Sequence, residues 1–190
     1  MFERFRAERA QRRRNAAIVD ALFGSIADAA RAPTLYTVHG VADTVMGRYE
    51  MMALHTWLFQ HRAKDAGEKD ADGPLGALAQ DVVDTFFREI DHTLREIGIG
   101  DTSVPKRMKK LARMVYGRWE AYGAALAASD RAAMAEAMRR NVYSEGGDPG
   151  GAEGLADYAF DASAALAVQD EAAFLAGRID YPNPAHRVAA

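Results

Sequence analysis

Residues 75–122 contain the strongest structural signal in the chain, because apolar residues recur there with helical spacing on both sides of a glycine-containing break. In the first half an apolar residue occurs every three or four positions: Leu75, Leu78, Val82, Phe86, Ile90, Leu94 and Ile97. Gly98 and Gly100 can end this helix, Asp101 or Ser103 can cap the next, and Pro105 suits its first turn. The second apolar stripe is Met108, Leu111, Val115, Trp119 and Tyr122. This stretch predicts a helical hairpin covered by the rest of the chain.

The other periodic segments are also helical, and none alternates strictly enough to predict a strand. We expect a helix over 16–31 capped by Asn15, and one over 44–63 capped by Asp43 or Thr44. A short alanine-rich helix should start at Ser129 or Asp130 and end near Tyr143. A long helix follows around 155–166, and Asp170 can cap a short turn through Leu175. The prediction is all-α: a basic arm over 1–14 and one compact domain of about six helices over 15–190.

The segment 44–63 is apolar around most of its circumference, which indicates either a central buried helix or a helix with an extra face for a partner. Burial is the preferred interpretation, because apolar helices in chains without a membrane span are usually core. Four side chains are the first candidates for contact with an apolar partner: Tyr49, Met52, Trp57 and Phe59. Met52 suits such a role because methionine is polarizable and adaptable.

Charge is unevenly distributed along the chain, although the net charge is only −3. Five cations fall between 106 and 113 without an acid among them: Lys106, Arg107, Lys109, Lys110 and Arg113. Four of them lie within about 100° of one another, opposite the apolar stripe of the same helix. This face is either an ordinary solvated helix surface or a site for phosphates, an anionic surface or an acidic partner, and it does not indicate specific DNA readout.

Catalytic chemistry has little support in the sequence. Cysteine is absent, and there is no Gly-x-Ser-x-Gly motif or phosphate-binding glycine loop. Glu89 and His92 form one Glu-x-x-His motif, but a di-iron site in a helical bundle needs two. The prediction is therefore no catalytic residue, no metal ligand and no cofactor. A helical-bundle metalloenzyme that uses Glu89 and His92 is the least favoured alternative.

Four segments, in this order, resemble the ubiquinol-cytochrome c chaperone family, to which the CBP-three type of cytochrome b assembly factor belongs. They read LYTVHGVADTVMGRYEMMALHTWLF, FFREIDHTLREIGIGDTSVPKRMKKLARMVYGRWEAY, RNVY and LAGRIDYPNP. The likeness covers about residues 21–184, and its most specific part surrounds Pro105 and Lys109. It implies an all-α, non-enzymatic chaperone that holds newly made cytochrome b for the cytochrome bc1 complex. In mitochondria such proteins work with a small partner subunit near the ribosome.

This resemblance and the residue patterns lead to one expectation for the chain, a bacterial member that acts in the cytoplasm or at the inner face of the inner membrane. The helix over 44–63 would contact the client, and the five cations would face the ribosome or anionic lipid. The alternative is a helical module that binds RNA or the ribosome through the same cations.

Overall fold

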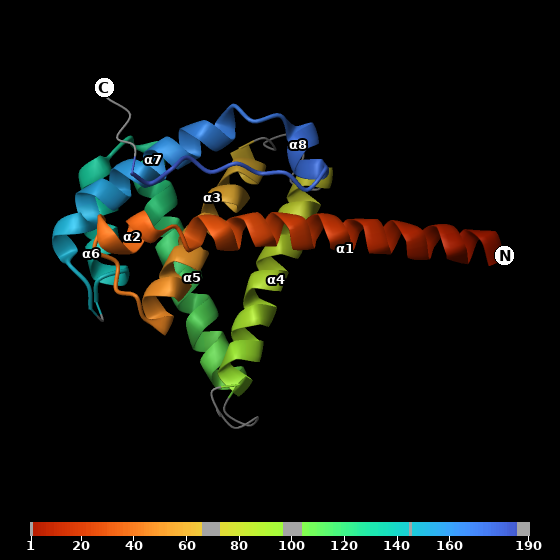
Figure 1. Cartoon of the computed structure of the whole chain (residues 1–190), viewed down its shortest axis with the longest axis horizontal. Helices are drawn as coiled ribbons and strands as arrows, with labels where there is room; N and C mark the ends of the chain where they lie inside the picture. Colours follow the sequence, from red (N-terminus) through yellow and green to blue (C-terminus); the bar gives the residue numbers. More distant parts are fainter. Residues whose placement is uncertain (1, 66–72, 97–103, 145, 186–190) are drawn as a thin grey trace.

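The computed structural model describes residues 2–65, 73–96, 104–144 and 146–185, and all regular structure in these ranges is helical. The elements are α1 (Phe2–Ala30), α2 (Pro33–Thr37), α3 (Val45–Asp65), α4 (Pro74–Glu96), α5 (Val104–Ala127), α6 (Arg131–Asn141), the short 3-10 turn η1 (Pro149–Gly151), α7 (Ala152–Ala167) and α8 (Glu171–Leu175). Figure 1 shows them gathered around α3. The predicted all-α fold is confirmed. None of the helices within the described ranges has the length and apolarity of a membrane span.

Helix α3 is buried almost all round, since it packs against α1, α4, α5 and α7. Residues 53–59 are all buried, including the polar residues His55 and Thr56. The interpretation of this helix as a central buried element is confirmed. Its high apolar content reflects four helical neighbours, so the composition alone does not indicate a free face.

The predicted hairpin is formed by α4 and α5, which diverge from a shared tip that lies away from the other helices (Figure 1). Near the body the stripes are buried at Phe86, Val115 and Trp119. Toward the tip they are only partly buried, as at Leu94 and Met108. The predicted helix stop and the caps in the connection fall on 97–103, outside the described residues, as does most of the loop expected at 64–74.

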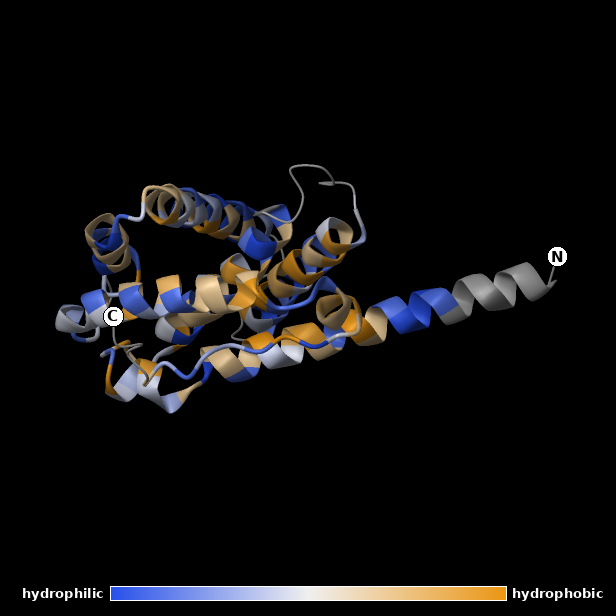
Figure 2. Cartoon of the chain, turned by 90° about the horizontal axis from the view of Figure 1, so that it is seen from above, coloured by the Kyte–Doolittle hydropathy of each residue, from blue (hydrophilic) through white to orange (hydrophobic). Residues whose placement is uncertain are grey.

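Three of the expected N-caps are present, and one is not. A side-chain oxygen accepts a hydrogen bond from a first-turn backbone N–H in three cases: Thr44 from Gly47 (3.1 Å), Asp130 from Ala133 (2.8 Å) and Asp170 from Ala172 (3.0 Å). The cap at Asn15 is wrong, because α1 begins at Phe2 and runs through residue 15 without a break. No glycine or proline interrupts residues 2–23, so the helix that packs on α3 simply continues into the basic arm. In Figure 2 hydrophilic residues mark the described part of α1 that extends beyond the other helices, and residues 11–17 are exposed.

After α8 the chain runs back across the helices as an extended segment. Gly177 has a φ of +77°, and a Cβ there would lie 3.2 Å from the Ala21 side chain of α1, so glycine suits both the turn and the contact. Further on, the Tyr181 hydroxyl donates a hydrogen bond to the His55 carbonyl oxygen (2.8 Å). His39 Nε2 lies 2.9 Å from the Pro184 carbonyl oxygen. The C-terminal segment is therefore part of the packed domain up to Pro184.

Candidate functional site

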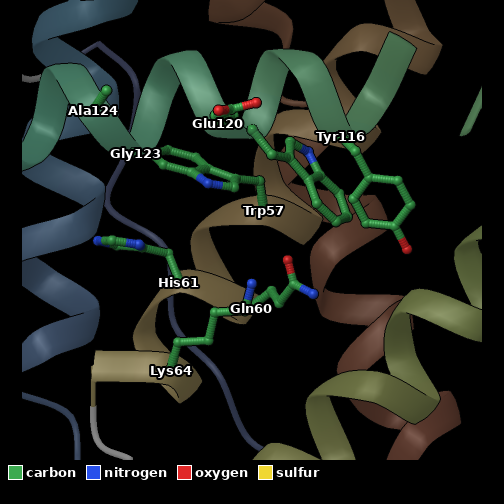
Figure 3. Close-up of a pocket in the computed structure, with 9 residues that line it drawn as sticks. Trp57, Gln60, His61, Lys64, Tyr116, Glu120, Gly123 and Ala124 are labelled. Atoms are coloured by element: carbon green, nitrogen blue, oxygen red, sulfur yellow. The ribbon is translucent and has the colours of Figure 1, made fainter. Parts of the chain in front are cut away.

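A groove of about 300 Å³ opens between the C-terminal halves of α3 and α5 (Figure 3). It is lined by Trp57, Gln60, His61 and Lys64 from α3, and by Tyr116, Trp119, Glu120, Gly123 and Ala124 from α5. We call it the aromatic groove, because three of its nine lining residues are Trp57, Tyr116 and Trp119. Both helices present residues spaced three or four apart, so one face of each helix forms one wall.

The floor of the aromatic groove is held by contacts between the two helices. The Trp119 indole Nε1–H donates to the Ala53 carbonyl oxygen (3.0 Å), which fixes α5 against α3. Trp57 stacks on His61, with ring centroids 5.3 Å apart and planes at 25°, and meets the Tyr122 ring edge-on at 5.5 Å. These ring contacts and the hydrogen bond fix the conformations of the floor side chains before a ligand binds. Binding therefore requires little additional ordering of these side chains.

Tyr116 extends the aromatic surface outward from the groove. It is 48% exposed, the most exposed aromatic residue among the large apolar side chains of the described chain. Its ring lies 5.4 Å from that of Trp119 and 5.9 Å from that of Phe87 on α4. The three rings therefore form a row of contacts from Trp119 through Tyr116 on α5 to Phe87 on α4.

The groove has an apolar floor and a polar rim. Gln60, Lys64 and Glu120 supply amide, ammonium and carboxylate groups around the indoles (Figure 3). At Gly123, an added methyl group would meet no atom within 4 Å, so the space in front of this residue is open. A depression of this kind can receive one apolar or aromatic side chain of another polypeptide, with hydrogen bonds at the edge.

A buried ion pair lies behind the groove. Arg118 Nη2 is 3.0 Å from Glu50 Oε1, and both side chains are more than nine-tenths buried. Burial raises the pKa of the neighbouring Tyr49 and Tyr122 hydroxyls, and the charge of Glu50 raises it further. These tyrosines therefore remain neutral, and the pair links α3 to α5 by charge as well as by apolar contact.

The four predicted client-contact residues occupy different environments. Phe59 is fully buried against Phe174, and Trp57 is 3% exposed, with its indole in the floor of the groove. Tyr49, stacked on Phe86, and Met52 are half-buried. The structure thus brings only Trp57 to the aromatic groove. Client contact by these four side chains remains a prediction.

The predicted basic face lies on the outer side of α5. All five of its members are exposed: Lys106, Arg107, Lys109, Lys110 and Arg113. None of them takes part in an ion pair or hydrogen bond with a described residue. We call Lys106, Lys109, Lys110 and Arg113, which point away from the packed side of the helix, the basic ridge.

Glu89 and His92 are exposed on α4, and neither lines the aromatic groove. His92 Nε2 lies 3.4 Å from the Glu96 carboxylate, as expected for a surface pair one turn apart. The described residues contain no group of three or more His, Asp or Glu side chains placed to hold a metal ion. Within the described ranges, no further metal ligand therefore joins this motif.

Most of the groove does not follow from the sequence patterns. Trp119 belongs to the packed stripe of its helix, as predicted, but the patterns assign no role to Tyr116, His61 and Glu120. One signal was available: Tyr116 falls roughly 100° from the apolar stripe of α5, and an aromatic residue off the stripe of an amphipathic helix has no core to enter. A second signal is that Trp57 and His61 are four residues apart, which places both rings on one face of α3.

The comparisons with known proteins agree with one another. The model of the family described as ubiquinol-cytochrome C chaperone matches residues 37–181, which include the whole aromatic groove and the basic ridge. A similar solved structure is the crystal structure of the Cbp3 homolog from Brucella abortus, which is 44% identical in sequence. The alignment covers 95% of this chain and 97% of that one, with a TM-score of 0.83. No curated protein matches the chain. The chain therefore belongs to the ubiquinol-cytochrome c chaperone family.

Proposed function

We propose that this protein is a non-enzymatic assembly chaperone that holds newly made cytochrome b before it enters the cytochrome bc1 complex. The observation that carries this proposal is the family match over residues 37–181, because it spans every element that forms the candidate site. The protein would act on the cytoplasmic side of the inner membrane, and it would need no cofactor.

The aromatic groove is the part of the surface best suited to the client. Cytochrome b is a membrane protein, so its segments expose large apolar side chains before assembly. Burial of one leucine or phenylalanine side chain in the groove would contribute about 1.5–3 kcal/mol. Contact of this strength is reversible, and reversibility suits a protein that must later release its client.

Within this proposal the side chains have different roles. Trp57 and Trp119 form the floor, and the exposed ring of Tyr116 makes the first contact. Phe59 is fully buried against Phe174, so it would stabilise the packing of α3 and would not itself meet the client. Tyr49 and Met52 lie outside the groove lining, so they would contribute only if the client extended along α3.

The experiment compares two glycines of α5 in a strain that lacks the chromosomal gene. Gly123 lines the groove, whereas Gly117 does not, and a Cβ at either position would meet no atom within 4 Å. Gly123→Leu places a side chain in the groove, and Gly117→Leu is the matched control. Both changes improve helix propensity by up to about 1 kcal/mol, so neither should unfold the protein.

The proposal predicts that the strain without the gene loses spectroscopically detected cytochrome b and bc1 complex, and that the wild-type gene restores both. Gly117→Leu should restore them too, whereas Gly123→Leu should restore little and co-purify less cytochrome b. Normal cytochrome b in the deleted strain would refute the function. Full restoration by Gly123→Leu would refute the groove as the client site.

A further inference from the structure

We propose that the basic ridge of α5 binds the headgroups of an anionic lipid bilayer and holds the chaperone at the membrane surface. This proposal rests on the proposed function in one respect: a location at the membrane surface is useful because the client is a membrane protein. Its evidence is independent of the client, since it comes from the geometry and the charge of the hairpin.

The ridge is a compact row of unneutralised charge. Lys106 and Arg113 are seven residues apart, which corresponds to about 10 Å along the helix axis. All four ridge side chains project to the side opposite the buried residues Val115 and Tyr122. The first acid after them on α5 is Glu120, about 10 Å beyond Arg113 along the axis. Such a row can place several ammonium and guanidinium groups on a flat surface at once.

The position of the ridge leaves it accessible. It occupies the half of α5 that leads to the hairpin tip, where the structure shows α4 as the neighbouring helix (Figure 1). Between residues 84 and 96, α4 carries four exposed or half-exposed acids against two arginines, a net charge of −2 with histidine neutral: Asp84, Glu89, Asp91 and Glu96. An anionic surface is therefore attracted more to the α5 arm of the hairpin than to the α4 arm.

The composition of the ridge favours a bilayer over RNA. Three of its four members are lysines, which act as flexible point charges and suit headgroups that move laterally. Proteins that recognise RNA usually stack bases on aromatic or arginine side chains. The ridge itself contains one arginine, Arg113, and no aromatic residue. Residues 141–190 carry eight acids against two arginines, so contact between this part of the chain and an anionic surface is unfavourable.

The test is sedimentation of the purified full-length protein with vesicles. One set contains phosphatidylcholine with about one third phosphatidylglycerol, and the other contains phosphatidylcholine alone. The variant is Lys109→Gln/Lys110→Gln. Its matched control, Arg12→Gln/Arg13→Gln, removes the same charge from exposed positions on α1, away from the hairpin. No client is present, so the result is independent of the cytochrome b proposal.

We expect wild-type protein to sediment with anionic vesicles only, and to be released at about 1 M salt, where charges are screened within a few ångströms. Lys109→Gln/Lys110→Gln should lower the partition coefficient about 30-fold, because each cation near the surface contributes roughly a factor of five. The arm variant should bind within about threefold of wild type. If the ridge variant does not fold, Lys106→Gln/Arg113→Gln serves instead.

Four results would overturn the inference: no binding by the wild type, equal loss in both variants, loss in the arm variant alone, or no loss in either. A fifth is binding of single-stranded RNA at concentrations where anionic vesicles are not bound, which would assign the ridge to nucleic acid.

Discussion

His55 should make the stability of this protein fall in mild acid, and its surroundings give the size of the effect. The side chain is fully buried on α3. Its Nδ1 lies 2.7 Å from the Met51 carbonyl oxygen, which can only accept, so Nδ1 carries the hydrogen. Its Nε2 therefore accepts from the Tyr158 hydroxyl at 2.7 Å. The ring also meets Tyr181 edge-on, so the neutral imidazole is enclosed on several sides.

Burial lowers the pKa of His55 from 6.5 to about 4, while the hydrogen bond to Met51 opposes this shift only in part. Because the folded pKa lies below the unfolded value, the unfolded chain binds more protons between about pH 4 and pH 6.5. Stability therefore falls as the pH falls through this window. The full loss is about 3 kcal/mol, and about 2 kcal/mol of it is reached near pH 5.

The assay is urea unfolding followed by circular dichroism at about pH 7.5 and about pH 5, on wild type and two variants. His55→Gln removes the titrating group but keeps a donor and an acceptor. His92→Gln is the control, since His92 is exposed on α4. From about pH 7.5 to about pH 5, the free energy of unfolding should fall by about 2 kcal/mol more in wild type and in His92→Gln than in His55→Gln. An equal loss in all three proteins would refute the reasoning.

Three further predictions concern stability and are measured by the same unfolding assay at neutral pH. Phe59→Ala should lower the free energy of unfolding by about 3–5 kcal/mol, because it leaves a cavity beside Phe174. A decrease of less than about 1 kcal/mol would contradict the burial of this ring. Arg118→Met should lower the free energy of unfolding by about 3–5 kcal/mol, because the Glu50 charge stays buried without this arginine. Glu50→Leu/Arg118→Met should lower it clearly less, because both charges are removed. A double variant that is as unstable as the single one would contradict this explanation. Asp130→Ala should cost about 1 kcal/mol through loss of the α6 cap, and no change would show that the cap contributes nothing.

The parts of the fold that depend on local pattern were predictable from the sequence. The stripes of α4 and α5 follow from apolar spacing, and the caps at Thr44, Asp130 and Asp170 follow from residue type ahead of a helix. The start of α1 was not predictable from Asn15, because a good capping residue can also lie inside a helix when no breaker precedes it.

The candidate site was largely beyond sequence reasoning, because it is formed by residues far apart in the chain. Trp57 and Trp119 belong to different helices, and periodicity does not show which helices are neighbours. The Glu50–Arg118 pair could not be expected, since buried charges are rare and each partner alone would be placed at the surface. The basic ridge was predictable because it depends on spacing within one helix, and its exposure agrees with that prediction.

If newly made cytochrome b contacts the aromatic groove, photo-crosslinking in living cells should detect this contact. A benzophenone amino acid replaces Tyr116 at the edge of the groove, or Val168, which is 86% exposed after α7 and does not line the groove. The account predicts a crosslink from position 116 to cytochrome b that Gly123→Leu reduces, and none from position 168. Equal crosslinking from both positions, or from position 168 alone, would contradict it.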